Sequence, residues 1–191
     1  MGRMPDGLPR YGSRDPGEDD WCSLATYFWL DVNRSLISPI EDISGEHASD
    51  IGHDWHYDGR DIDVFHYYQM PGAWNGGSNY DLLRLNASRM LSADPDIRAE
   101  ARQQVTNWVG AMRNGLAPLS ELADVDALLM NRGTAGGGLS YEWAWSLLTT
   151  GTTTVGGLSV DLGLGPWNCT KCQPRTDHED HSHIRLIDEF F

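Results

Sequence analysis

The chain of 191 residues is 40% hydrophobic and 22% charged and contains eight Trp, a composition typical of a globular protein rather than a disordered one. Its formal net charge of -14 argues against a nucleic-acid partner and against anionic membrane surfaces, because both are recognised through clustered Lys and Arg. No apolar run approaches membrane-spanning length, so no membrane insertion is expected.

The first 20 residues carry Gly, Pro and charges without apolar periodicity, which indicates an extended lead-in (1–20) before a domain over residues 21–191. This lead-in also lacks the apolar core of a secretory signal. Apolar content rises over residues 21–36, where we expect the first core element. The alternation over residues 61–68 (DIDVFHYY) then predicts a strand.

The clearest helix is expected over residues 95–114. Asp94 can cap it, Pro95 suits its first turn, and Gly115 can end it. Apolar residues at spacings of three and four form one face of this helix: Ile97, Ala101, Val105, Trp108 and Met112.

Weaker patterns complete the chain. Residues 80–91 and 141–148 favour helices, residues 125–130 fit either a helix or a buried strand, and the Gly-rich stretch 155–164 favours a strand with bends. The alternation HSHIRLI over residues 181–187 predicts a strand. The mixture predicts an α+β single domain, in which a small antiparallel sheet flanked by helices brings the two His-rich segments together on adjacent strands.

The seven histidines are concentrated, with two of them in residues 53–63 and three in residues 178–183. A catalytic zinc takes three protein ligands and leaves a fourth position for water. His56 and Asp63 can supply a nitrogen and an oxygen to one metal if a turn separates them, and Gly59 is where such a turn is expected.

In the second window, His181 and His183 are two residues apart, so a strand directs both side chains to one face. One of them can then bind the metal while the other lies over the open position. Asp61 and Asp180 are available nearby for orientation or proton transfer. Solvated polar loops in an acidic protein are the alternative for both windows.

These windows resemble two motifs of the LAS zinc metallopeptidases, a family named for lysostaphin, D-Ala-D-Ala peptidases and sonic hedgehog. The similarity is strongest to penicillin-insensitive murein endopeptidase-like proteins. Their first motif reads roughly His-x2-His-x2-Gly-x-Asp-x-Asp, which is matched here by His53, His56, Gly59, Asp61 and Asp63. Their second motif, His-x2-His-x-His followed by an apolar residue and Arg, is matched by His178, His181, His183, Ile184 and Arg185. The resemblance covers about a quarter of the chain and is weak over residues 70–165.

The resemblance implies one zinc per chain, held by His56, Asp63 and His183. It implies that Asp180 is the general base and then the acid, and that His181 stabilises the oxyanion or polarises the attacking water. His53, His178 and Asp61 would support the site or contact substrate, and Trp55 and Tyr57, which flank a ligand, are further candidates.

The implied activity is hydrolysis of D-amino-acid-containing peptide bonds in peptidoglycan, of the murein endopeptidase or DD-carboxypeptidase type. Such an enzyme acts on the cell wall, in the periplasm or outside the cell. Because no signal peptide is visible, cytoplasmic storage and delivery by a phage or as an effector stay open.

Two alternatives remain at this point. A non-catalytic zinc-containing module would recognise a cell-wall or protein partner without cutting it. Separately, Cys169 and Cys172 could join His178 and His181 in a small structural zinc site, although a simple disulfide or two buried thiols agrees better with the spacing.

Overall fold

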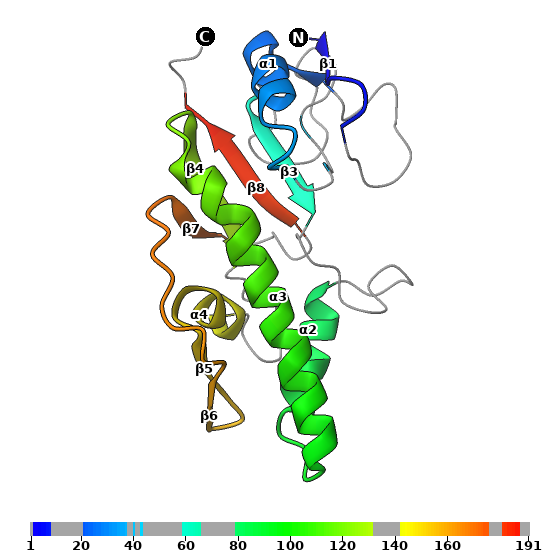
Figure 1. Ribbon diagram of the computed structural model, residues 1–191, viewed down its shortest axis with the longest axis vertical. Helices are drawn as coiled ribbons and strands as arrows, with labels where there is room; N and C mark the ends of the chain where they lie inside the picture. The colour runs from blue at the N-terminus through cyan, green and yellow to red at the C-terminus, as the bar shows by residue number, and fades with distance from the viewer. Residues whose placement is uncertain are drawn as a thin grey trace.

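The computed structural model describes residues 2–8, 21–37, 40, 43, 59–65, 79–131, 142–175 and 181–187. The helices in these ranges are α1 (Leu24–Val32), α2 (Asn79–Arg89), α3 (Pro95–Glu121) and α4 (Glu142–Thr150). The strands are β1 (Gly2–Arg3), β2 (Trp21–Cys22), β3 (Asp61–Phe65), β4 (Val125–Asn131), β5 (Thr152–Val155), β6 (Leu158–Asp161), β7 (Cys172–Arg175) and β8 (His181–Leu186). The described chain is therefore mixed α+β, as predicted (Figure 1).

The largest sheet has the strand order β3-β8-β4-β7. Strand β8 is antiparallel to both of its neighbours, β3 and β4. Strand β7, however, pairs with β4 in parallel, so the prediction of a wholly antiparallel sheet is wrong at this edge. The physical reason is the connection: the chain from β4 to β7 passes through α4 and the β5–β6 hairpin, which is long enough to return to the same end of the sheet.

Helix α3 begins as predicted and ends later. The Asp94 side chain accepts hydrogen bonds from the backbone N–H groups of Asp96 (2.9 Å) and Ile97 (3.4 Å), which caps the helix. Gly115 does not end it, because Leu116 and Leu119 continue the buried apolar face. Burying a Leu side chain contributes about 1.5–3 kcal/mol, whereas a helical Gly costs about 1 kcal/mol relative to Ala.

Four other segments form regular structure where the sequence patterns placed it. Helices α2 and α4 form close to the predicted ranges, and residues 125–131, which the sequence left open between a helix and a strand, are a strand. The Gly-rich stretch is an antiparallel hairpin of β5 and β6. It turns at Gly156 and Gly157, whose φ angles of 54° and 79° are those that a two-residue hairpin turn requires.

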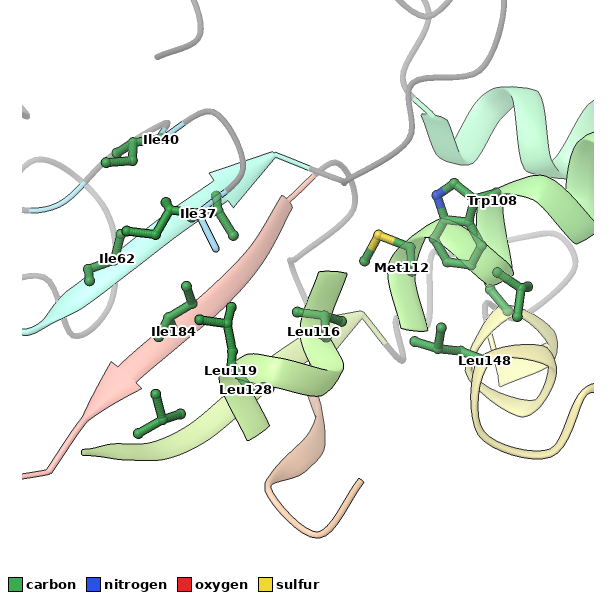
Figure 2. Close-up of a cluster of buried hydrophobic side chains, with 14 of the residues drawn as sticks. Ile37, Ile40, Ile62, Trp108, Met112, Leu116, Leu119, Leu128, Leu148 and Ile184 are labelled. Carbon is green, nitrogen blue, oxygen red and sulfur yellow. The ribbon is translucent and has the colours of Figure 1, made fainter. Parts of the chain in front are cut away.

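Helix α3 links the two parts of the hydrophobic core. Figure 2 shows Leu116 and Leu119 beside Leu128 of β4 and Ile184 of β8, whereas Trp108 lies further along the helix on the side of α4. In Figure 1 the sheet lies at one end of α3, and α2 and the β5–β6 hairpin lie at the other. The lead-in also contributes to this core, because β1 pairs with β2 and both Met4 and Leu8 are buried.

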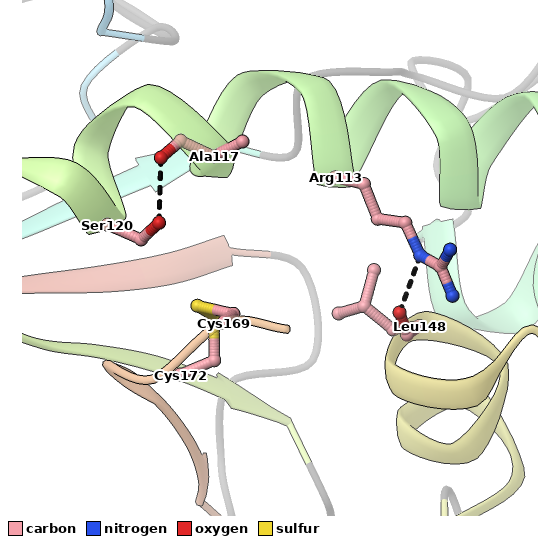
Figure 3. The surroundings of a disulfide bond; sticks show 6 residues. All are labelled: Arg113, Ala117, Ser120, Leu148, Cys169 and Cys172. Atoms are coloured by element: carbon pink, nitrogen blue, oxygen red, sulfur yellow. Dashed lines mark hydrogen bonds between the residues drawn. A yellow bond between two sulfur atoms is a disulfide. The ribbon is translucent and has the colours of Figure 1, made fainter. Parts of the chain in front are cut away.

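A disulfide joins Cys169 and Cys172, which lie 5.3 Å apart between Cα atoms at the start of β7 (Figure 3). Of the possibilities that the sequence leaves open for this pair, the disulfide is the one that forms. It excludes both sulfurs as thiolate ligands of a structural zinc, because each is already bonded. Cys22 is buried and takes no part in a disulfide.

Candidate metal centre

The two motif segments meet on the adjacent strands β3 and β8. Asp63 pairs directly with His183, and Asp61 with Arg185. Side chains alternate between the two faces of a strand. One face of this pair enters the hydrophobic core through Ile62, Val64 and Ile184. The opposite face carries the polar residues Asp61, Asp63 and His183. All three of these polar residues are buried nonetheless. The fold therefore places two carboxylates and an imidazole together where water has little access.

The imidazole of His183 lies between the two carboxylates. Its Nε2 is 2.6 Å from Asp61 Oδ1, and its Nδ1 is 2.9 Å from Asp63 Oδ1. The Arg185 guanidinium also approaches Asp61, with Nε 3.5 Å from the same Oδ1 atom. Asp61 is thus held by two cationic side chains of β8, and it fixes the orientation of the His183 ring.

The electrostatics of this cluster favour a protonated His183 in the absence of a metal. Burial by itself lowers the pKa of the imidazole, because it disfavours the charged form. Hydrogen bonds and charge attraction to Asp61 and Asp63 outweigh burial and raise the pKa of His183 to about 9. A metal ion that binds His183 must therefore displace a proton, so metal binding should release acid.

This pKa predicts a pH dependence of the free energy of unfolding of the metal-free protein. The pKa of His183 is raised from 6.5 to about 9, so the folded state holds this proton more tightly than the unfolded state. The resulting stabilisation, about 3 kcal/mol, is fully present below pH 6.5 and is lost as the pH rises through about 9. Urea unfolding of chelator-treated protein at several pH values in this range measures the loss.

The matched control is His183→Gln, which removes the titrating ring and keeps a polar side chain. The difference in unfolding free energy between the two proteins should shrink with rising pH, whereas titrating groups remote from this cluster affect both proteins alike. A difference that stays constant from pH 6 to pH 9.5 would contradict the assigned pKa.

Two of the donor atoms in this cluster are of the types that zinc binds. Zinc binds neutral imidazole nitrogen and carboxylate oxygen at about 2.0–2.2 Å in a tetrahedral arrangement, which separates two ligand atoms by about 3.3 Å. The Nδ1 atom of His183 and Oδ1 of Asp63 are 2.9 Å apart, so a small separation of the two side chains would suffice. Asp61 supplies the outer carboxylate that a zinc-binding His normally contacts through its other nitrogen.

The start of β3 is anchored by Gly59. Its φ angle is 70°, and the backbone N–H of Ser23 donates a hydrogen bond to its carbonyl at 3.3 Å. A Cβ atom at this position would lie 2.7 Å from Ser23 N, so only glycine fits without movement of the backbone. Gly59 thus has the backbone conformation that a turn favours and packs against the N-terminal end of α1, while residues 56–58 of the expected turn lie outside the described part of the chain.

The structure places some of the predicted site residues and not others. Asp61, Asp63 and His183 come together, and the backbone of His181 pairs with Phe65 at the start of β8. Six predicted residues lie outside the described part of the chain: His53, Trp55, His56, Tyr57, His178 and Asp180. Within the described ranges, no group of three or more His, Cys, Asp or Glu side chains is arranged to hold a metal ion.

Among the described residues, Arg185 also contacts this cluster, through Asp61, and no role was predicted for it from the sequence. The sequence did contain the information needed, because Arg185 lies two residues after His183 on a predicted strand and therefore on the same face.

Comparison with known proteins adds no family to these observations. No protein-family model matches the chain, and no curated protein is significantly similar to it in sequence.

Proposed function

We propose that this protein is a zinc-dependent peptidase that hydrolyses D-amino-acid-containing peptide bonds in peptidoglycan, as a murein endopeptidase or a DD-carboxypeptidase. The observation that carries the proposal is the buried contact of Asp63 with His183 Nδ1, while Asp61 binds the opposite ring nitrogen. Two residues of the two motifs thus meet across adjacent strands, although they lie far apart in the chain.

One zinc ion per chain would be held by His56, Asp63 and His183. When bound, zinc lowers the pKa of a coordinated water toward about 7 and polarises a peptide carbonyl. A hydrogen bond from Nε2–H of His183 to Asp61 selects the neutral tautomer whose lone pair is on Nδ1. That nitrogen is the one that faces Asp63, so Asp61 prepares the ring for a metal on the Asp63 side.

The remaining roles follow from the resemblance. Asp180 would accept a proton from the attacking water and later deliver it to the leaving amine. His181 would stabilise the charge that develops on the carbonyl oxygen. The supporting positions, which would hold the site together or contact substrate, are His53, Trp55, Tyr57 and His178. An enzyme of this kind would act in the periplasm or outside the cell. No helix in the described ranges is long and apolar enough to cross a membrane.

The first test is digestion of purified peptidoglycan with and without a chelator, followed by mass spectrometry of the released muropeptides. We expect chelator-sensitive cleavage that returns when zinc is added back, and the fragment masses identify the bond that is cut. A sample that contains zinc and cleaves nothing would contradict the proposed hydrolysis. It would favour a non-catalytic zinc module that recognises a partner.

Substitution of Asp61 tests its proposed role in positioning His183. Asp61→Asn keeps an oxygen that can accept from Nε2–H but loses the negative charge, and Asp61→Ala loses both. We expect zinc affinity to fall about tenfold in the first variant and about a hundredfold in the second, the range typical of outer-shell partners of a zinc ligand. Competition with a chromogenic chelator measures the affinity.

A role in positioning, as opposed to general stability, has a separate readout. Nitrogen NMR of the metal-free protein above pH 9, where the His183 ring is neutral, reports its tautomer, which should become mixed in Asp61→Ala and stay fixed in the wild type. Asp126→Asn is the matched control, because Asp126 is an exposed carboxylate on β4 of the same sheet. Unchanged zinc affinity and tautomer in both Asp61 variants would exclude the proposed role.

A further inference from the structure

A second site lies at the end of α3 remote from the sheet. A cavity of about 360 Å³ opens between the first turns of α3 and strand β6, with the end of α2 beside it. Its apolar wall includes Leu91, Leu158 and Val160, and its polar rim is formed by Arg98 and Arg102. Figure 1 shows α2 and the hairpin at this end of α3. Leu116 packs against the sheet, and Arg98 lies about 27 Å from it along the axis of α3.

The two arginines are held in place by backbone carbonyls. Arg98 Nη1 donates to the carbonyl oxygens of Ser92 (2.6 Å) and Ala93 (2.8 Å) in the turn between α2 and α3. Arg102 Nη2 donates to the carbonyl oxygen of Asp161 on β6. Each guanidinium is therefore fixed at one nitrogen and retains other N–H donors, five being present in every Arg side chain.

Their charges are not neutralised within the described part of the chain. Neither Arg98 nor Arg102 is within ion-pair distance of a carboxylate there, although the protein has 28 acidic residues against 14 Lys and Arg. Arg89, by contrast, pairs with Glu100 at 2.5 Å. Two like charges four residues apart on a helix repel each other, so an anion bound between them would relieve that repulsion.

The outer edge of β6 borders the same cavity. In a hairpin with a two-residue turn, Val155 and Leu158 exchange backbone hydrogen bonds, so the backbone groups of Ser159 and Asp161 point away from β5. The hydrogen bond from Arg102 to the Asp161 carbonyl agrees with this direction. Ser159, which lines the cavity, therefore offers a backbone N–H and C=O to an extended chain.

We propose that this cavity binds the C-terminal carboxylate of an extended peptide whose last side chain is apolar. The two guanidinium groups would receive the carboxylate, the edge of β6 would pair with the peptide backbone, and the wall around Leu91 and Leu158 would take the side chain. The volume is within the range of small-molecule sites. The proposal rests on this cavity alone and is independent of the zinc site.

The test is NMR titration of the full-length, isotopically labelled protein with N-acetyl-Ala-Leu and with its C-terminal amide. We expect the acid to shift backbone amide signals of residues 98–102 and 158–161 saturably, with a Kd of about 1 mM or tighter. The amide should bind at least tenfold more weakly, because it lacks the charge. Equal binding of acid and amide, or no saturable shift with the acid, would overturn the proposal.

Variants and a second anion complete the test. Arg98→Gln and Arg102→Gln should each weaken binding of the acid about tenfold, whereas Arg84→Gln, which changes an exposed Arg of α2 outside the cavity, should leave it unchanged. Inorganic phosphate should bind more weakly than the peptide acid. Tighter binding of phosphate would show a simple anion site and overturn the peptide assignment. If a variant fails to fold, the comparison of the peptide acid with its amide on the wild-type protein still tests the proposal.

Discussion

Replacement of Asp63 by Ala is expected to reduce bound zinc from about one ion per chain to background, and chelator-sensitive hydrolysis should disappear with it. Asp63 is buried and its Oδ1 lies 2.9 Å from Nδ1 of His183, so its replacement removes a carboxylate oxygen directly beside the ring nitrogen that would bind the metal. Loss of one of three protein ligands also removes a charge that the cation needs. Elemental analysis by mass spectrometry of extensively dialysed protein measures the zinc content.

Two comparisons separate loss of the ligand from loss of the fold. Asp63→Asn keeps the shape of the side chain, and circular dichroism shows whether either variant remains folded. Asp126→Ala removes an exposed carboxylate from β4 of the same sheet and should keep its zinc. His56→Ala should behave like Asp63→Ala. Full zinc occupancy in folded Asp63→Ala and His56→Ala would rule out the proposed ligand set.

Replacement of Asp180 by Ala should leave zinc binding intact and lower kcat about 10²–10⁴-fold, the usual contribution of a general acid–base group. Asp180 directly precedes β8 and lies three residues before His183, so its position in the chain is close to the proposed centre. The variant should also lose the acidic limb of the pH–rate profile, because that limb reports ionisation of the base. Muropeptide release at saturating substrate gives kcat.

Glu179→Ala is the matched control, since it removes the neighbouring carboxylate from the same segment. We expect near wild-type hydrolysis in this variant. If instead Glu179→Ala loses activity and Asp180→Ala keeps it, the general base is Glu179. If both variants keep activity with zinc bound, neither carboxylate transfers the proton, and the proposed mechanism is wrong at that step.

The alternation of apolar and polar residues was sufficient to predict the strands that carry the site. Asp61, Ile62, Asp63 and Val64 alternate between the polar face and the core, and the segment around His183 does the same. Two such strands with motif residues on one face bring those residues together when they pair. The contact of Asp61 with His183 depends on the register of the pair, which local sequence does not determine.

Other features depend on interactions between distant segments. Gly115 has the local properties of a helix end, but the burial of Leu116 and Leu119 against the sheet extends α3 beyond it. The parallel pairing of β7 with β4 follows from the path of the intervening chain, which no local pattern encodes. The disulfide between Cys169 and Cys172 depends on redox conditions as well as on spacing.

The position of β8 between β3 and β4 has a consequence for how the protein folds. This strand follows every other described strand in the sequence, yet it lies in the interior of the sheet, and His183 contacts Asp61 across 122 positions of the chain. During synthesis on the ribosome, the edges of β3 and β4 that pair with β8 must therefore stay unpaired until residues 181–186 emerge. Closing so long a loop is entropically costly and slow. The proposed catalytic centre should accordingly be among the last parts of the nascent chain to form.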